Sequence, residues 1–140
     1  MVSRENIKEF LLGGKCECVI KNLETENSFN YKLIVAKDDN FTFFVYVKVG
    51  KEHVYAGILK VLPNNRYKYI KGSKGSIDPQ DTSIQALMFT LTRALVLPNQ
   101  IVVLHLGTCS RCGRKLEDAE SIARGMGPIC LKKTRDILGG

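Results

Sequence analysis

The sequence predicts an α+β protein in which an antiparallel β-meander is packed by one long helix and followed by a zinc knuckle or treble-clef-like module. Three observations lead to this prediction. Short runs rich in Val, Phe and Tyr recur with turns about every eight to twelve residues, which is typical of an antiparallel sheet. One longer segment has the apolar period of a helix, and a cysteine cluster follows it. We therefore expect an α+β domain over residues 1–104 and a zinc-binding module over residues 105–140.

Five strand-like runs make up the expected meander, and polar turns separate them. The third run is apolar on both faces, which indicates a central strand. A sixth run, residues 101–106, leads directly into the cysteines. The five runs of the meander are residues 15–23, 29–36, 41–49, 53–61 and 66–70.

The long helix is expected to begin at Asp78, a residue type that caps helices, with Pro79 at the first helical position. Pro98 would end it. Apolar residues recur along this segment at helical spacing and predict a stripe that faces the sheet, with Met88 and Phe89 in the core. The stripe consists of Ile84, Leu87, Met88, Leu91, Ala94 and Leu95.

Composition places the chain among globular proteins, because 44% of its 140 residues are apolar and 25% are charged. The chain has no run of about 18 apolar residues, so the sequence predicts no membrane span. The first residues are not followed by the apolar core of an export signal, so we expect a cytoplasmic location. The net charge of +7 is local: residues 60–74 hold five basic and no acidic side chains. Such a patch favours a polyanionic partner.

The spacing His105-x3-Cys109-x2-Cys112-x17-Cys130 predicts a metal site. Two thiolates separated by two residues can bind one ion from a single tight turn, and Gly113 can adopt the positive φ that this turn needs. Pro128 predicts a helix start that places Cys130 in the first turn. Three thiolates and one imidazole favour Zn²⁺, and a closed shell of four ligands predicts a structural ion.

Alternatives exist for several of these residues. His105 could be an ordinary strand histidine, and the Cys-x-x-Cys pair could be a redox pair in a different fold. The rival fourth ligands are Asp118, Glu120, His53 or a cysteine of the 16/18 pair. We interpret Cys16 and Cys18 as small buried apolar side chains. Because the five cysteines are odd in number, a disulfide framework is not expected and a reducing cytosol is.

Residues 109–116 (Cys-Ser-Arg-Cys-Gly-Arg-Lys-Leu) and 120–130 (Glu-Ser-Ile-Ala-Arg-Gly-Met-Gly-Pro-Ile-Cys) resemble a small zinc-binding domain of unknown function that is abundant in phage and prophage proteins. That family has a similar Cys-x-x-Cys-Gly-Arg-x-Leu knuckle, then Gly-x-Gly-Pro-x-Cys, and a histidine at the place of His105. A weaker resemblance to full-length phage members covers residues 10–15 and 29–32. The resemblance implies a phage or prophage origin, hence the host bacterial cytosol, and a zinc module. It implies no activity.

No catalytic set stands out, so we expect no enzyme. Asp38 and Asp39 are adjacent in a turn, and the loop over residues 71–76 lacks the spacing of a phosphate-binding loop. We expect a phage-type accessory protein that binds single-stranded DNA or RNA, because tyrosines alternate with basic residues. The alternatives are an edge strand protected by lysines, and a module that binds and inhibits or redirects a host protein or defence complex. The expected nucleic-acid residues are Arg66, Tyr67, Lys68, Tyr69, Lys71, Lys74, Arg111 and Arg114.

Overall fold

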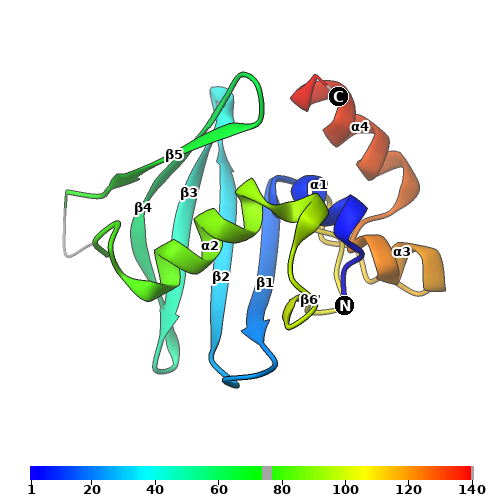
Figure 1. Cartoon of the computed structure of the whole chain (residues 1–140). Coiled ribbons are helices and arrows are strands. Elements are labelled where there is room, and N and C mark those ends of the chain that lie inside the picture. Colours follow the sequence, from blue (N-terminus) through cyan, green and yellow to red (C-terminus); the bar gives the residue numbers. More distant parts are fainter. Residues whose placement is uncertain (74–76, 140) are drawn as a thin grey trace.

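The structure, a computed structural model, describes residues 1–73 and 77–139 and has an α+β fold (Figure 1). Six strands form one sheet, and all of its neighbouring pairs are antiparallel. The strands are β1 (Lys15–Asn22), β2 (Ser28–Ala36), β3 (Asp39–Val49), β4 (Glu52–Leu62), β5 (Arg66–Lys71) and β6 (Ile101–His105). The helices are η1 (Arg4–Asn6), α1 (Ile7–Leu11), α2 (Thr82–Thr92), η2 (Ala94–Val96), α3 (Ala119–Arg124) and α4 (Pro128–Leu138).

The strand order is β5-β4-β3-β2-β1-β6. The first five strands therefore form a meander, and β6 joins the sheet at the edge formed by β1. The expected antiparallel sheet is confirmed. Strand β6 pairs with β1, and His105 lies opposite Cys18. The expected boundary between residues 104 and 105 therefore falls inside a strand that completes the sheet.

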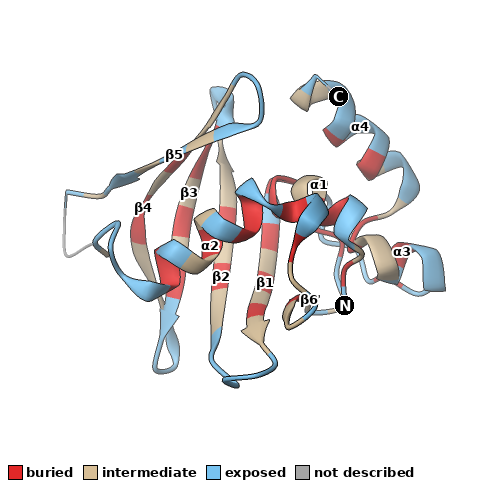
Figure 2. Cartoon of the chain, viewed as in Figure 1, coloured by how far each residue is buried: buried red, intermediate tan, exposed pale blue. Residues whose placement is uncertain are grey.

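Helix α2 lies across one face of the sheet in Figure 1. A buried hydrogen bond joins the two, in which Tyr31 Oη on β2 donates to the carbonyl oxygen of Ser83 at 2.6 Å. Residues at alternate positions of the central strands are buried, as the colours in Figure 2 show. The shared core contains Tyr31, Leu33, Phe43, Val45, Leu59, Ile84, Leu87 and Leu91.

The expected helix start is wrong. Helix α2 begins at Thr82, and its cap is Asp81, whose side chain accepts a hydrogen bond from the Ser83 backbone nitrogen at 3.0 Å. Asp78 instead accepts a hydrogen bond from the Gln80 nitrogen at 2.8 Å, inside the preceding turn. Asp81 also accepts a hydrogen bond from the Ser83 hydroxyl at 2.7 Å, so its side chain holds the first turn at two points.

The helix also ends earlier than its apolar stripe. Arg93 leaves the helical conformation, and the chain continues as the short helix η2. As a result, Leu95 is 74% exposed, although the stripe placed it on the sheet. Phe89 is 41% exposed, so the expectation that it belongs to the core is wrong. Helix α2 is not longer than every other helix, because α2 and α4 have 11 residues each. The expectation of one long helix is therefore not met.

No helix in the described ranges combines the length and apolar character needed to cross a membrane.

Candidate functional site

Cys109 and Cys112 lie in the turn that follows β6. The backbone of this turn closes on itself: the Gly113 nitrogen donates to the Cys109 carbonyl at 3.0 Å, and the Cys109 nitrogen donates to that of Arg114 at 2.8 Å. Gly113 has a φ of 79°, a conformation that glycine adopts without steric cost, as the sequence predicted. The short loop thus holds two cysteines on one turn.

Cys130 comes to this turn from the first turn of α4. The helix begins at Pro128, the start that the sequence predicted, and Gly127 is its N-cap residue. The three sulfur atoms of Cys109, Cys112 and Cys130 lie within 4.8 Å of one another. Cys109 is buried, Cys130 is half-buried and Cys112 is exposed. Three cysteines at this spacing could hold a metal ion.

The surroundings of the sulfurs have opposite effects on two of these thiols. Burial tends to raise the pKa of Cys109, but backbone N–H groups of Cys112, Arg111 and Gly127 point at its sulfur and lower the pKa to about 7. Burial raises the pKa of Cys130 to about 11, and the neighbouring sulfurs of Cys109 and Cys112 add to this effect. Backbone N–H groups thus favour the thiolate form of Cys109, whereas burial and the adjacent sulfurs oppose that of Cys130. Soft sulfur donors of this kind suit Zn²⁺.

His105 does not join the three sulfurs. Its Nε2 lies 2.8 Å from the carbonyl oxygen of Ile122, and its Nδ1 accepts a hydrogen bond from the Gly107 nitrogen at 2.8 Å. These partners require the hydrogen to be on Nε2 and leave neither nitrogen free. The ring also lies beside that of Phe10, with 6.2 Å between centroids. The histidine therefore fastens α3 to the end of β6, and it is not the fourth ligand in this arrangement.

The rival ligands are engaged elsewhere. Cys16 and Cys18 are fully buried in the core, and burial raises the pKa of Cys16 well above its usual value. The ring of His53 lies 2.9 Å from the side-chain oxygen of Asn30 on the sheet. Asp118 caps α3 by accepting a hydrogen bond from the Ser121 nitrogen at 3.0 Å. Across residues 1–73 and 77–139, no Glu, Asp, His or further Cys shares the 4.8 Å group, and this includes Glu120.

Backbone hydrogen bonds fix the cysteine turn to the rest of the fold. The Lys15 nitrogen at the start of β1 donates to the Ser110 carbonyl at 2.6 Å, and the Ser110 nitrogen donates to that of Gly125 at 3.1 Å. Cys109 and Met126 belong to the same apolar core as the sheet. The cysteine segment and the sheet therefore share one core.

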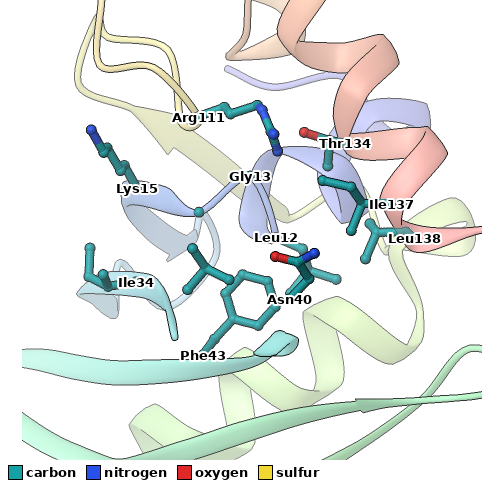
Figure 3. A pocket seen from close by; sticks show the side chains of 12 residues that line it. Leu12, Gly13, Lys15, Ile34, Asn40, Phe43, Arg111, Thr134, Ile137 and Leu138 are labelled. Atoms are coloured by element: carbon teal, nitrogen blue, oxygen red, sulfur yellow. The ribbon is translucent and has the colours of Figure 1, made fainter. Parts of the chain in front are cut away.

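A cleft of about 310 Å³ lies beside the cysteine turn, between the sheet and α4 (Figure 3). Its floor is apolar and includes Phe43, Ile137 and Leu138. Arg111 extends from the turn toward Thr134, whereas the Lys15 ammonium points away from the apolar end. Arg111 thus lies in this cleft, on another element than the predicted basic strand.

The structure separates the tyrosines of β5 from their basic neighbours. Arg66 and Lys68 are exposed, but Tyr67 and Tyr69 alternate with them and pack against the core. The Tyr69 hydroxyl donates to the Ile77 carbonyl at 2.7 Å, and burial raises its pKa to about 12. Of the remaining predicted residues, Lys71 and Arg114 are exposed, and Lys74 lies outside the described residues. The tyrosine rings are therefore turned away from the basic side chains of their own strand.

The opposite face of the sheet carries an aromatic cluster that the sequence analysis missed. The apolar core residues lie on the α2 side of the sheet. We call the other side the open face, because most of its residues are half-buried or exposed. On it, the ring centroids of Tyr46 and Tyr55 are 5.6 Å apart, and those of Phe44 and Tyr55 are 6.3 Å apart. Strand register places several lysines on the same face, among them Lys32, Lys48, Lys60 and Lys68.

Comparison with known proteins gives one result. Residues 102–135 match the model of a family described as a family of unknown function (DUF6011). The match covers most of β6, all three clustered cysteines and most of α4. Neither the curated proteins nor the solved structures gave a match. Similarity is thus concentrated in the cysteine segment.

Proposed function

We propose that Cys109, Cys112 and Cys130 hold a Zn²⁺ ion in a zinc-knuckle or treble-clef-like layout. The support is the close group of three sulfurs, one of which has a pKa lowered to about 7 by backbone N–H groups. Bound zinc would offset most of the thiolate charge and supply on the order of 10 kcal/mol toward folding of the segment. The same proposal includes the phage or prophage origin that the sequence suggested. It also includes a reducing cytosol, which keeps the five cysteines free.

Metal analysis of the purified protein tests the zinc site. We expect about one zinc per chain, and loss of that zinc in Cys109→Ser, Cys112→Ser and Cys130→Ser. Cys18→Ala is the matched control, because Cys18 is buried in the core away from the cluster and its loss should leave the zinc bound. Full zinc content in a Cys109→Ser/Cys112→Ser double variant would contradict the assignment.

We propose further that the chain is a non-enzymatic accessory protein that binds single-stranded DNA or RNA on the open face. The observation that carries this is the group of Phe44, Tyr46 and Tyr55 rings among lysines on an uncovered sheet surface. Unpaired bases stack on aromatic faces, while basic side chains meet the phosphates. Duplex nucleic acid offers no free base faces, so single strands are the expected ligand.

The commitment of both histidines supports a role without catalysis. His105 uses both ring nitrogens within the fold, and His53 lies against Asn30. Burial and the nearby Lys32 lower the pKa of His53, so it is a neutral side chain near neutral pH. The hydrogen-bond partners of the two histidines are Ile122, Gly107 and Asn30, and none of these carries a nucleophilic side chain.

Fluorescence anisotropy with labelled single-stranded oligonucleotides tests the open face. Because stacking of one base contributes ~1–3 kcal/mol, Tyr46→Ala and Tyr55→Ala should each weaken binding by about 5- to 150-fold. Phe41→Ala is the control, since Phe41 is an exposed aromatic residue on the same strand but on its other face. No binding at low salt, or equal loss in the control, would contradict the proposal.

A protein partner is the second candidate, and one observation favours it. Leu95 and Val96, adjacent in η2, are 74% and 73% exposed. Large exposed apolar side chains side by side are typical of protein contacts. A stoichiometric complex that resists nuclease and high salt, and that Leu95→Asp abolishes, would support this candidate instead.

A further inference from the structure

We infer that the metal held by Cys109, Cys112 and Cys130 has a fourth coordination position that is open to solvent and accepts a monodentate imidazole or thiolate donor from outside the chain. This inference rests on the zinc site proposed above. Zinc in proteins is almost always bound by four ligands in tetrahedral geometry, so a set of three cysteines leaves one position to fill.

Two of the chain's own donors near the cluster are hydrogen-bonded within the fold. His105, the obvious fourth ligand by sequence, bonds Ile122 and Gly107 through its two nitrogens. To bind the metal it would have to give up at least one of these hydrogen bonds, which join β6 to α3 and to the start of the cysteine turn. Asp118 is also committed, because its carboxylate caps α3. Both would therefore disrupt local structure by binding the ion.

A cavity leads to the sulfurs from outside. It measures about 300 Å³ and is lined by all three cysteines together with Arg114, Glu117 and Ser121. Cys112 is exposed at this cavity. A volume of this size admits a side chain or a small molecule, since a water molecule occupies about 30 Å³ in the liquid. Three protein ligands with an accessible fourth position distinguish zinc sites that exchange a ligand from closed structural ones.

The charge around the cavity bears on the outside donor. Three thiolates and Zn²⁺ carry a net charge of −1, and the cavity wall adds no net charge, because Arg114 and Lys115 are balanced by Glu117 and Asp118. A neutral imidazole therefore leaves the charge at −1, whereas a thiolate brings it to −2. Both are ligands that zinc takes beside three cysteines.

Glu117 is the chain's remaining competitor. It lines the same cavity and its side chain is exposed. A carboxylate ligand from Glu117 would close the site and contradict the inference, so the test includes this residue.

Cobalt substitution tests the inference with the whole chain. Co²⁺ replaces Zn²⁺ at thiolate sites, and its visible absorption reports the ligand set. We expect the spectrum of Co²⁺-loaded protein to shift and saturate on titration with imidazole and, separately, with 2-mercaptoethanol. Glu117→Gln and His105→Gln should have the unmodified spectrum and the same response to added imidazole. Circular dichroism shows whether His105→Gln is folded.

The outcomes separate this inference from the zinc site itself. Failure of Co²⁺ and Zn²⁺ to bind would remove the proposed metal site. Binding of one ion with a spectrum indifferent to both additives would leave the metal site in place and overturn the open position. A spectrum altered by Glu117→Gln or His105→Gln alone would also overturn it. A spectrum that changes with protein concentration would support an outside donor and identify it as a second copy of the chain.

Discussion

Lys48 and Lys68 on the open face can meet phosphates, and their removal gives a quantitative prediction. The Nζ of Lys32 lies 3.7 Å from Oε1 of Glu17, and the Nζ of Lys60 lies 3.8 Å from Oδ2 of Asp39. These two lysines therefore form ion pairs with carboxylates. Lys48 and Lys68 are exposed and form no ion pair with any residue in the described part of the chain. The perturbation is therefore the double variant Lys48→Ala/Lys68→Ala.

The magnitude follows from counterion release. On a single strand, each phosphate contact contributes about −0.7 to the slope of log K against log salt concentration. If Lys48 and Lys68 each meet one phosphate, the double variant should have a slope that is shallower by about 1.4. The aromatic contribution to binding should be unchanged, so the two proteins should differ less as the salt concentration rises.

The assay is fluorescence anisotropy with one oligonucleotide at a series of salt concentrations. Lys132→Ala/Lys133→Ala on α4 is the matched control, because it removes the same charge from the +7 total at two exposed lysines outside the sheet. We expect the slope of the control to stay close to that of the unmodified protein. Equal changes in both variants would show that net charge, and not the open face, determines the attraction, and would refute the reasoning.

Three further predictions concern stability. Tyr31→Phe removes a buried hydrogen bond of 2.6 Å and should lower the free energy of unfolding by about 1 kcal/mol, or the Tm by about 3 °C, in a thermal melt. Burial raises the pKa of Tyr69 from 10.0 to about 12, so the folded state retains a proton that the unfolded state loses. Stability should therefore be full below pH 10 and fall as the pH rises toward 12, and the fall should be smaller in Tyr69→Phe. Chelation of the metal should speed hydrogen exchange across residues 107–135 and leave β2, β3 and β4 protected, as mass spectrometry would show.

The sheet could be predicted because its signal is local. Alternation and turn residues mark each strand to within about two residues, as in the run from Phe41 to Val49 that became β3. The pairing of β6 with β1 could not be predicted, because residues 101–105 carry no local sign of which strand they join. The helix start was predicted at Asp78, three residues too early. The observed cap is Asp81, which accepts hydrogen bonds from both the backbone nitrogen and the hydroxyl of Ser83.

The candidate site could likewise be predicted only in part from the sequence. The three cysteines could be predicted, because a tight turn and a Pro-initiated helix fix their positions over short stretches of chain. The position of His105 in this structure depends on its contact with Ile122, 17 residues away in the chain, which spacing alone does not reveal. The aromatic cluster needed the register itself. A β-bulge between Val45 and Tyr46 sets Tyr46 opposite Tyr55, and no sequence pattern showed that shift.

The distance in the sheet between the cysteine segment and the aromatic cluster leads to a last prediction. The cysteine turn is fastened to the start of β1 through Lys15 and Ser110, whereas Tyr46 and Tyr55 lie on β3 and β4, with β2 between. Metal removal should therefore leave oligonucleotide binding within about twofold of that of the loaded protein, while Tyr55→Ala weakens it strongly. Circular dichroism shows whether the sheet survives the chelator. If the sheet survives and binding is lost, the cysteine segment itself contacts the nucleic acid, and Arg111 and Arg114 become its expected contacts.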